Sequence, residues 1–408
     1  MNINVIRLRQ ILDGREEELI KENTNFLEEI NNELIDDDLL LVEGDKNAPF
    51  SVFFIESGGS ESKFLPYFEK ADAPILLISN GKNNSLPASL EIKTYCNLHD
   101  KQAVVLTGAE KNIAKLLRHI AKAMGAKASL KGNNLGVIGE PSDWLIASRV
   151  DYSLVKERFD INLIDISMDE LKAEIDKNQL EDIPHKSTLD KKYKSKEVLA
   201  GAYNIYSALK RLIKKYDLSG LTIRCFDLLG EYKNTACLAL ALLNEEGITS
   251  ACEGDVPSLL TMHLLRALTG RSSFQANPSY MDEEKKTVLF AHCTLPLNMV
   301  SKYELLTHFE SGLGIGIKGE LSLGPVTISK LFFDKNGKLD ASISVVGTIK
   351  ENCSLPGYCR TQIRVELSDY DYFVLLKEDF GNHVLISYGD IADDFYALLS
   401  LYNGDLDK

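Results

Sequence analysis

Apolar positions follow two different patterns along this chain, and the pattern changes near residue 271. Before that point, short apolar runs typical of buried strands alternate with longer segments in which apolar residues recur at helical spacing. The first part is expected to contain strands at 4–8, 39–42, 52–56, 74–79 and 103–107, with helices at 15–34, 63–70, 86–95 and 110–124. This alternation predicts a parallel sheet with helices on both faces.

A polar Gly-Asn-Asn break at 132–134 begins a second unit of the same kind. Its expected strands are 135–138, 161–166, 221–225 and 248–252, and its longest expected helix is 195–216. Beyond residue 271 the pattern changes to strands: 326–333 and 339–349 flank an Asp-Lys-Asn-Gly sequence typical of a hairpin turn, and further strands are expected at 361–367, 372–376 and 383–387. The sequence therefore predicts an α/β fold with two Rossmann-like parallel-sheet domains, 1–131 and 132–272, followed by a mostly antiparallel β domain, 273–408.

Composition excludes several classes of partner. The 408 residues carry a formal net charge of -14, which argues against nucleic acid or an anionic membrane as the main partner. No apolar run approaches the ~18 to 20 residues that a membrane-spanning helix needs. The seven cysteines form no C-x-x-C pair, and the chain begins with a strand-like segment rather than a signal peptide. We expect reduced thiols and a cytoplasmic location.

Four polar residues near expected element ends are candidates for a metal site. Glu253 follows the strand 248–252, His292 follows the strand 287–291, and Asn277 and His383 complete the set. Carboxylate, amide and imidazole ligands suit Mn²⁺, Co²⁺ or Zn²⁺ better than a thiolate site does. Two other interpretations stay open at this point, because His292 could be a buried polar residue at a strand end and Asn277 could turn the chain before a Pro-Ser turn.

The order of these motifs resembles that of a known family. The segments are EGD at 253–255, FQANPSY at 274–280, LFAHC at 289–293 and GNH at 381–383. Together with the order of domains, they resemble the metal-dependent L-fucose and L-arabinose isomerases. The resemblance implies an aldose–ketose isomerase that acts on an open-chain sugar through an ene-diolate and uses a divalent metal, with Mn²⁺ as the first expectation. It also implies that Glu253 is a metal ligand and the catalytic carboxylate, and that His292 and His383 are ligands.

Asn277 departs from the family pattern. The matching position normally carries a second acidic residue, whereas an amide can coordinate a metal or contact substrate but cannot act as a base. Three explanations remain open: Glu253 moves the proton alone, Asp255 or Asp282 replaces the missing acid, or the substrate is itself anionic. Asp255 has a second possible role as a helix cap. The alternative function is a sugar-binding or regulatory homologue that has lost the chemistry.

The sequence offers weaker indications of further substrate-binding residues and of the oligomeric state. Trp144 could stack on a sugar or simply pack, Arg360 could hold a sugar oxygen or be structural, and Gly59 with Ser60 could bind a sugar oxygen or only turn the chain. Three glycines at 312, 314 and 316 are not followed by a helix, so we expect a loop near substrate or a glycine-containing strand rather than a dinucleotide site. The resemblance implies a homo-oligomer, a trimer or hexamer, with active sites between subunits.

Overall fold

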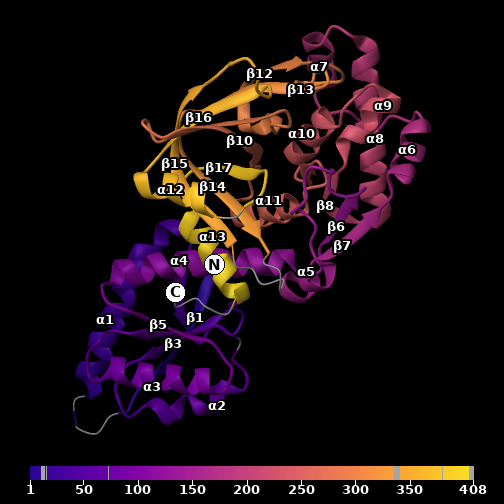
Figure 1. Ribbon diagram of the computed structural model, residues 1–408. Coiled ribbons are helices and arrows are strands. Elements are labelled where there is room, and N and C mark those ends of the chain that lie inside the picture. Colours follow the sequence, from indigo (N-terminus) through magenta and orange to yellow (C-terminus); the bar gives the residue numbers. More distant parts are fainter. Residues whose placement is uncertain (11–13, 15, 72, 334–340, 379, 404–408) are drawn as a thin grey trace. The chain divides into compact units, whose positions relative to one another are not determined.

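The computed structural model describes residues 1–10, 14, 16–71, 73–333, 341–378 and 380–403 (Figure 1). The backbone forms two compact units. The first comprises residues 1–124 and the end of the chain from residue 397, and the second comprises residues 125–396. No helix in the described ranges is both long enough and apolar enough to cross a membrane.

The first unit contains a five-stranded parallel sheet in the order β2-β1-β3-β4-β5 (Figure 1). Its strands are β1 Asn2–Leu8, β2 Leu40–Glu43, β3 Ser51–Ile55, β4 Ile75–Ser79 and β5 Ala103–Thr107. Its helices are α1 Glu16–Leu34, α2 Leu65–Phe68 and α3 Ser85–Leu98, with short 3₁₀ turns at Ile35–Asp37 and Glu61–Lys63, and α4 Glu110–Leu130 runs on into the second unit. Strands β3 and β4 are apolar and almost entirely buried, as expected where helices cover a parallel sheet.

The second unit begins with a four-stranded parallel sheet in the order β7-β6-β8-β9. The strands are β6 Asn134–Ile138, β7 Asn162–Ile166, β8 Leu218–Ile223 and β9 Thr249–Cys252. The helices are α5 Tyr152–Phe159, α6 Met168–Asp176, α7 Lys186–Lys192, α8 Lys196–Tyr216, α9 Leu228–Tyr232, α10 Cys237–Glu245 and α11 Val256–Thr269, with a 3₁₀ turn at Cys225–Asp227. Helix α8 packs against β8 and α10, and α10 and α11 pack against β9 (Figure 1).

A closed antiparallel barrel follows in the same unit, with the strand order β10-β11-β16-β15-β14-β17. Its strands are β10 Phe274–Asp282, β11 Thr287–His292, β14 Gly324–Phe332, β15 Ala341–Asn352, β16 Thr361–Leu367 and β17 Val384–Tyr388. Between β11 and β14, a 3₁₀ turn at Leu297–Met299 leads into a two-stranded sheet of β12 Val300–Leu306 and β13 Gly316–Leu321. Helix α12 Asp369–Lys377 lies between β16 and β17, and α13 Ala392–Asn403 follows β17.

This architecture confirms the predicted fold class: two parallel-sheet α/β regions precede an antiparallel β region. The division into three domains at 131 and 272 stays a prediction. Strands β14 and β15 pair as an antiparallel hairpin, as the sequence predicts, but the Asp-Lys-Asn-Gly turn between them lies outside the described residues.

Two local predictions were wrong. The expected strand at 372–376 lies within α12, because Ser368 caps the helix by accepting a hydrogen bond from the Asp371 amide and because acidic residues occupy the first turn. The expected Pro-Ser turn at 278–279 is an irregularity within β10, where the register with β11 shifts between Pro278 and Tyr280. Proline has no amide hydrogen for the ladder, so a bulge accommodates it without ending the strand.

Candidate active site

Glu253 lies in a tight turn immediately after β9. Glu253 and Gly254 both have left-handed backbone conformations, with φ of 65° and 72°. A Cβ at Gly254 would lie 2.5 Å from the carbonyl oxygen of Glu140, so only glycine fits there. Asp255 then caps α11 by accepting a hydrogen bond from the Ser258 amide. The EGD sequence thus turns the chain from strand to helix and holds the Glu253 side chain at the carboxyl end of the parallel sheet.

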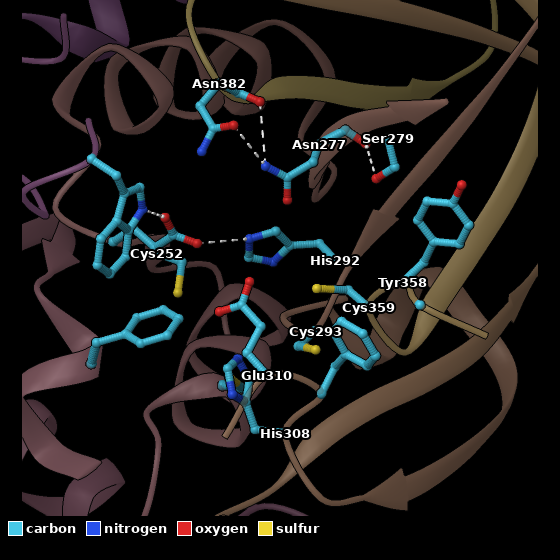
Figure 2. Close-up of a pocket in the computed structure, with 16 residues that line it drawn as sticks. Cys252, Asn277, Ser279, His292, Cys293, His308, Glu310, Tyr358, Cys359 and Asn382 are labelled. Atoms are coloured by element: carbon cyan, nitrogen blue, oxygen red, sulfur yellow. Dashed lines mark hydrogen bonds and ion pairs between the residues drawn. The ribbon is translucent and has the colours of Figure 1, made fainter. Parts of the chain in front are cut away.

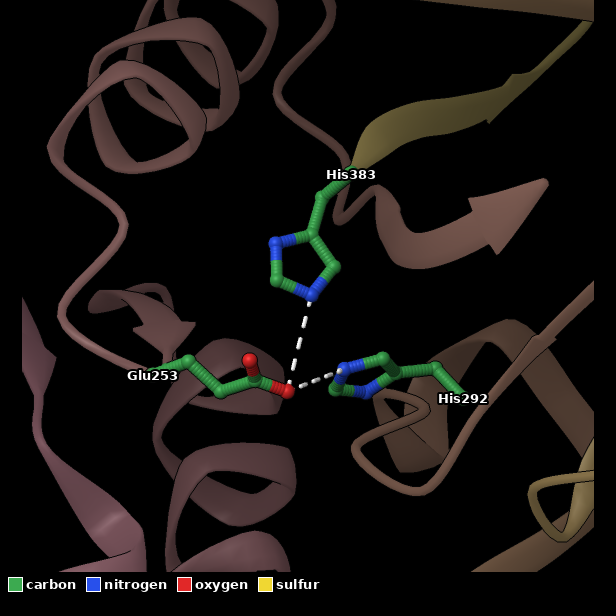
Figure 3. Close-up of side chains that lie close together, drawn as sticks. All are labelled: Glu253, His292 and His383. Carbon is green, nitrogen blue, oxygen red and sulfur yellow. Dashed lines mark ion pairs between the residues drawn. The ribbon is translucent and has the colours of Figure 1, made fainter. Parts of the chain in front are cut away.

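Two histidines from the barrel meet the Glu253 carboxylate (Figure 3). His292 is the last residue of β11, and His383 immediately precedes β17. The Nε2 atoms of His292 and His383 lie 3.5 and 3.6 Å from Glu253 Oε1. All three side chains are nearly buried, so this is an enclosed cluster rather than a surface group.

A polar partner contacts the Nδ1 atom of each imidazole ring, on the side away from Glu253. His383 Nδ1 lies 2.8 Å from Asp255 Oδ2, and because a carboxylate only accepts, Nδ1 carries the hydrogen and Nε2 faces Glu253. Lys330 Nζ, also buried, lies 3.1 Å from the same Asp255 oxygen. His292 Nδ1 lies 2.8 Å from Thr294 Oγ1. Such contacts fix ring orientation in metal sites, where a ligating histidine binds through one nitrogen and uses the other for a hydrogen bond.

The charges in the cluster lower the pKa of Glu253 and raise the pKa of His383. Burial alone would raise the pKa of Glu253, but the neighbouring His383 and His292 hold that pKa well below its usual value. Burial alone would lower the pKa of His383, but the carboxylates of Glu253 and Asp255 raise it to about 9. Burial lowers the pKa of His292. The cluster therefore contains one ionised carboxylate and two imidazoles aimed at one point.

This cluster fits a divalent transition-metal ion. Ligands about 2.1 Å from a common ion lie between about 3 and 4 Å apart. The two carboxylate–imidazole separations of 3.5 and 3.6 Å fall in this range, and the three ligand atoms all lie within 4.8 Å of one another. His383 Nε2 is buried and has no hydrogen-bond partner among the residues that the structure describes, an unfavourable condition that coordination would relieve. One carboxylate with two imidazoles suits Mn²⁺, Co²⁺ or Zn²⁺. Glu253, His292 and His383 could therefore hold such an ion.

A cavity of about 430 Å³ opens beside the cluster (Figure 2). Its volume suits a small molecule such as a monosaccharide. The cavity is lined by Trp144, Phe226, Cys237, Cys252, Glu253, Asn277, Ser279, His292, Cys293, His308, Phe309, Glu310, Gly357, Tyr358, Cys359 and Asn382. Polar side chains from the parallel-sheet region and from the barrel therefore line one partly open cavity next to the candidate metal ligands.

The chain is similar to sugar isomerases. No model of a known protein family matches it. It is 26% identical over 213 residues to a sulfoquinovose isomerase of Clostridium sp. (strain MSTE9), an alignment that covers 48% of this chain and 45% of that protein. It is 23% identical over 309 residues to a sulfoquinovose isomerase of Alkalicoccus urumqiensis, covering 72% of this chain and 69% of that protein. The chain thus matches less than half of the length of the Clostridium protein.

The proteins to which the chain is similar are thus named as sugar isomerases, the kind of enzyme that the motifs also resemble. A sulfoquinovose isomerase of Priestia aryabhattai shows the same degree of similarity, 25% identity over 210 residues.

Two further predicted site residues lie in the cavity wall. The Asn277 amide nitrogen donates to the backbone oxygen and Oδ1 of Asn382, at 3.4 and 3.1 Å, which leaves its own amide oxygen directed into the cavity (Figure 2). Trp144 Nε1 donates to Glu253 Oε2 at 2.6 Å, and the indole packs edge-on against Phe226. Trp144 is half-exposed and lies in a turn between β6 and α5.

The other predicted contacts lie elsewhere. Arg360 is not part of this cavity wall; its guanidinium donates to the backbone oxygen and hydroxyl of Thr307, at 2.6 and 3.0 Å. Gly59 and Ser60 follow β3 in the first unit, where the Ser60 hydroxyl donates to the Ser57 carbonyl oxygen. Their role as substrate contacts stays a prediction.

Sequence analysis missed the residues that the β12–β13 loop brings to the cavity. His308 and Glu310 both belong to this loop, and burial lowers the pKa of His308 to about 4. The only local signal was the glycine-rich segment at 312–316, because glycines with left-handed backbones allow a compact loop. Asp282 is not among the cavity residues, and Asp255 lies behind His383, so neither stands where Asn277 replaces the expected acid.

Proposed function

We propose that this protein is a metal-dependent aldose–ketose isomerase whose substrate is an anionic sugar, with sulfoquinovose as the first candidate. The observation that carries the proposal is the meeting of Glu253, His292 and His383 beside a sugar-sized cavity. The similarity to proteins named sulfoquinovose isomerase supports the substrate, since that sugar bears a sulfonate. Mn²⁺, a cytoplasmic location and a trimeric or hexameric assembly stay predictions from the sequence.

The chemistry follows from the donor set. A divalent ion held by Glu253, His292 and His383 would polarise the sugar carbonyl and stabilise the negative charge of an ene-diolate. Asp255 and Thr294 keep the two rings in the orientation that frees both Nε2 atoms. Trp144 holds Glu253 Oε2, which leaves Oε1 for the ion. The Asn277 amide oxygen faces the cavity and is free to accept a hydrogen bond from a sugar hydroxyl.

The proposal is tested by assaying purified protein with Mn²⁺ against sulfoquinovose, L-fucose, L-arabinose and D-arabinose. We expect ketose formation from sulfoquinovose. Removal of the ion with a chelator should abolish that activity, and added Mn²⁺ should restore it. The variant Glu253→Gln should lose both the activity and the rise in melting temperature that Mn²⁺ produces in the native protein. Metal-loaded protein that converts none of these sugars would remove the isomerase proposal.

A second candidate function is a sugar-binding or regulatory protein with the same fold. Asn277 favours it, because an amide stands where the resembling isomerases carry a carboxylate. Binding without turnover separates the two functions. A protein whose melting temperature rises with sulfoquinovose, but which forms no ketose with Mn²⁺ present, would support this candidate. A protein that purifies without metal and gains no thermal stability from Mn²⁺ would support it further.

A further inference from the structure

The reaction that we propose needs a group that removes a proton from one carbon and returns it to the next. A carboxylate is suited to this work when its pKa lies near the working pH. Among the described residues that line the cavity, the carboxylates are those of Glu253 and Glu310. The amide of Asn277 cannot accept a proton in this way. The choice therefore lies between Glu253 and Glu310.

Glu253 is poorly suited to accept a proton from carbon. Its Oε2 accepts a hydrogen bond of 2.6 Å from the Trp144 indole, and its Oε1 faces the Nε2 atoms of both histidines. Hydrogen bonds and positive charge next to a carboxylate favour its ionised form. An ion bound at Oε1 would add to this effect, so both oxygens are committed to holding the site together.

Glu310 is placed differently. Figure 2 shows its carboxylate pointing toward His292 at the cavity that both residues line. Among the described residues, none forms an ion pair or hydrogen bond with this carboxylate. Glu310 is an exposed residue, and partial burial of its carboxylate together with the negative charge of Glu253 raises its pKa above the usual value. A carboxylate that points toward the site and has no partner among the described residues is free to accept a proton from a bound sugar.

The loop that carries Glu310 is fixed at both ends. Arg360 holds the backbone oxygen of Thr307 at 2.6 Å, and the Tyr193 and Thr235 hydroxyls donate to the backbone oxygens of Gly314 and Ile315 at 2.9 and 3.1 Å. Within the loop, amide hydrogen bonds link residues 308, 312 and 313. Side chains that move protons need such positioning, because rates fall steeply with misplacement.

We propose that Glu310 carries the carbon-bound proton in this isomerase, while Glu253 holds the metal; this rests on the function proposed above. The Glu310 carboxylate takes the proton from C2 of the open-chain aldose. The C2–H electron pair then forms the C1–C2 double bond, and the carbonyl pair moves to O1, which takes up a proton. In the second half O2 loses its proton, the C2 carbonyl forms, and the double-bond pair takes the proton back from Glu310 at C1. The proton gained by O1 balances the one lost by O2.

The experiment compares Glu310→Gln with two other variants, Glu253→Gln and the control Glu304→Gln. Glu304 is an exposed carboxylate on the neighbouring strand β12. Three quantities are measured: kcat and KM with sulfoquinovose, the rise in melting temperature with Mn²⁺ alone, and exchange of the C2 hydrogen with deuterated water. We expect Glu310→Gln to lower kcat and C2 exchange by about 10² to 10⁴ fold and to leave KM and the Mn²⁺ effect nearly unchanged. Glu253→Gln should lose the Mn²⁺ effect, and Glu304→Gln should behave as the native protein.

Other outcomes distinguish this inference from the proposed function. If the native protein is active and Glu310→Gln keeps its kcat within about threefold, the Glu310 assignment is wrong and the isomerase proposal stands. If Glu310→Gln also loses the Mn²⁺ effect, Glu310 supports the site rather than moving protons, and the assignment is again wrong. The variant Glu310→Asp, which keeps the carboxylate, guards against a folding defect: it should recover part of kcat. A native protein without isomerase activity would overturn both proposals.

Discussion

Asp255 serves two elements at once. Its carboxylate caps α11 through the Ser258 amide, pairs with the buried Lys330, and accepts a hydrogen bond from His383 Nδ1. Burial would raise the pKa of Asp255, but Lys330 and His383 lower it well below its usual value. The side chain is therefore ionised and fully buried. The cap that the sequence predicts is present, and the same oxygens orient a candidate metal ligand.

Replacing Asp255 with asparagine should weaken both stability and metal binding. The change leaves the Lys330 charge buried without its partner, which typically costs about 3 to 5 kcal/mol, and loosens the orientation of His383, which typically costs about 10 to 100 fold in metal affinity. Denaturant unfolding and calorimetric titration with Mn²⁺ measure the two effects. The control is Ser167→Ala, which removes the cap of α6 and should cost only about 1 kcal/mol with unchanged Mn²⁺ affinity. Unchanged affinity in Asp255→Asn would contradict the orienting role.

His263 should make stability depend on pH. It is buried in α11, where its Nε2 lies 3.0 Å from Asn133 Oδ1 and its Nδ1 lies 3.2 Å from Thr249 Oγ1. Burial lowers the pKa of His263 to about 4 from the usual 6.5. Above pH 6.5 the ring is neutral in both states. Between 6.5 and 4 only the unfolded chain takes up the proton, so stability falls as pH drops, by up to about 3 kcal/mol in total. The free energy of unfolding is measured between pH 6.5 and 4 for the native protein and for His263→Gln. We expect it to change less with pH in the variant, and equal slopes would contradict the prediction.

The position of the β12–β13 loop depends on a close contact between the backbone of Gly314 and Thr235. Gly312 and Gly314 both have left-handed backbones, with φ of 66° and 59°. A Cβ at Gly314 would lie 2.7 Å from the Thr235 amide nitrogen, whereas a Cβ at Gly312 would meet nothing within 4 Å. The two positions share the conformational demand and differ in available space. Alanine variants at the two positions therefore form a matched pair, and comparing them tests whether the loop must pack closely against Thr235.

Gly314→Ala should cost more than Gly312→Ala. Each carries the penalty of a left-handed alanine, about 1 kcal/mol, and Gly314→Ala adds about 1 to 3 kcal/mol for overpacking against Thr235. Urea unfolding gives the difference in stability. Because the loop carries Glu310, we also expect Gly314→Ala to lower kcat on sulfoquinovose and Gly312→Ala to leave it nearly unchanged. Equal stabilities of the two variants would mean that the loop can shift away from Thr235 at little cost.

At the scale of the whole molecule, the candidate ligands tie two parts of the second unit together. Glu253 follows a strand of the parallel sheet, and His292 and His383 come from the barrel. All three belong to residues 125–396. An ion at this site would therefore stabilise the contact between the four-stranded sheet and the barrel.

Mn²⁺ should protect backbone amides from hydrogen exchange in this unit selectively. At 100 times its dissociation constant, a ligand that binds only the folded state adds about 2.7 kcal/mol. Hydrogen exchange followed by mass spectrometry should show slower exchange around β9, β11 and β17 and unchanged exchange in β1, β3 and β4. Addition of a chelator should reverse the effect. Protection absent from β9 and β11, or a chelator with no effect, would contradict binding at Glu253, His292 and His383.

The sequence by itself determined the fold class and the positions of three candidate ligands at or next to strand ends. Apolar periodicity and turn chemistry act over short stretches, so β9, the EGD turn and the Asp255 cap could be predicted locally. Local periodicity failed where capping competed with strand propensity, as in α12. Only tertiary structure decided which distant side chains meet. It brought Glu253 to the two histidines, directed Glu310 into the cavity and turned Arg360 toward Thr307, because such contacts depend on how the parallel sheet and the barrel pack.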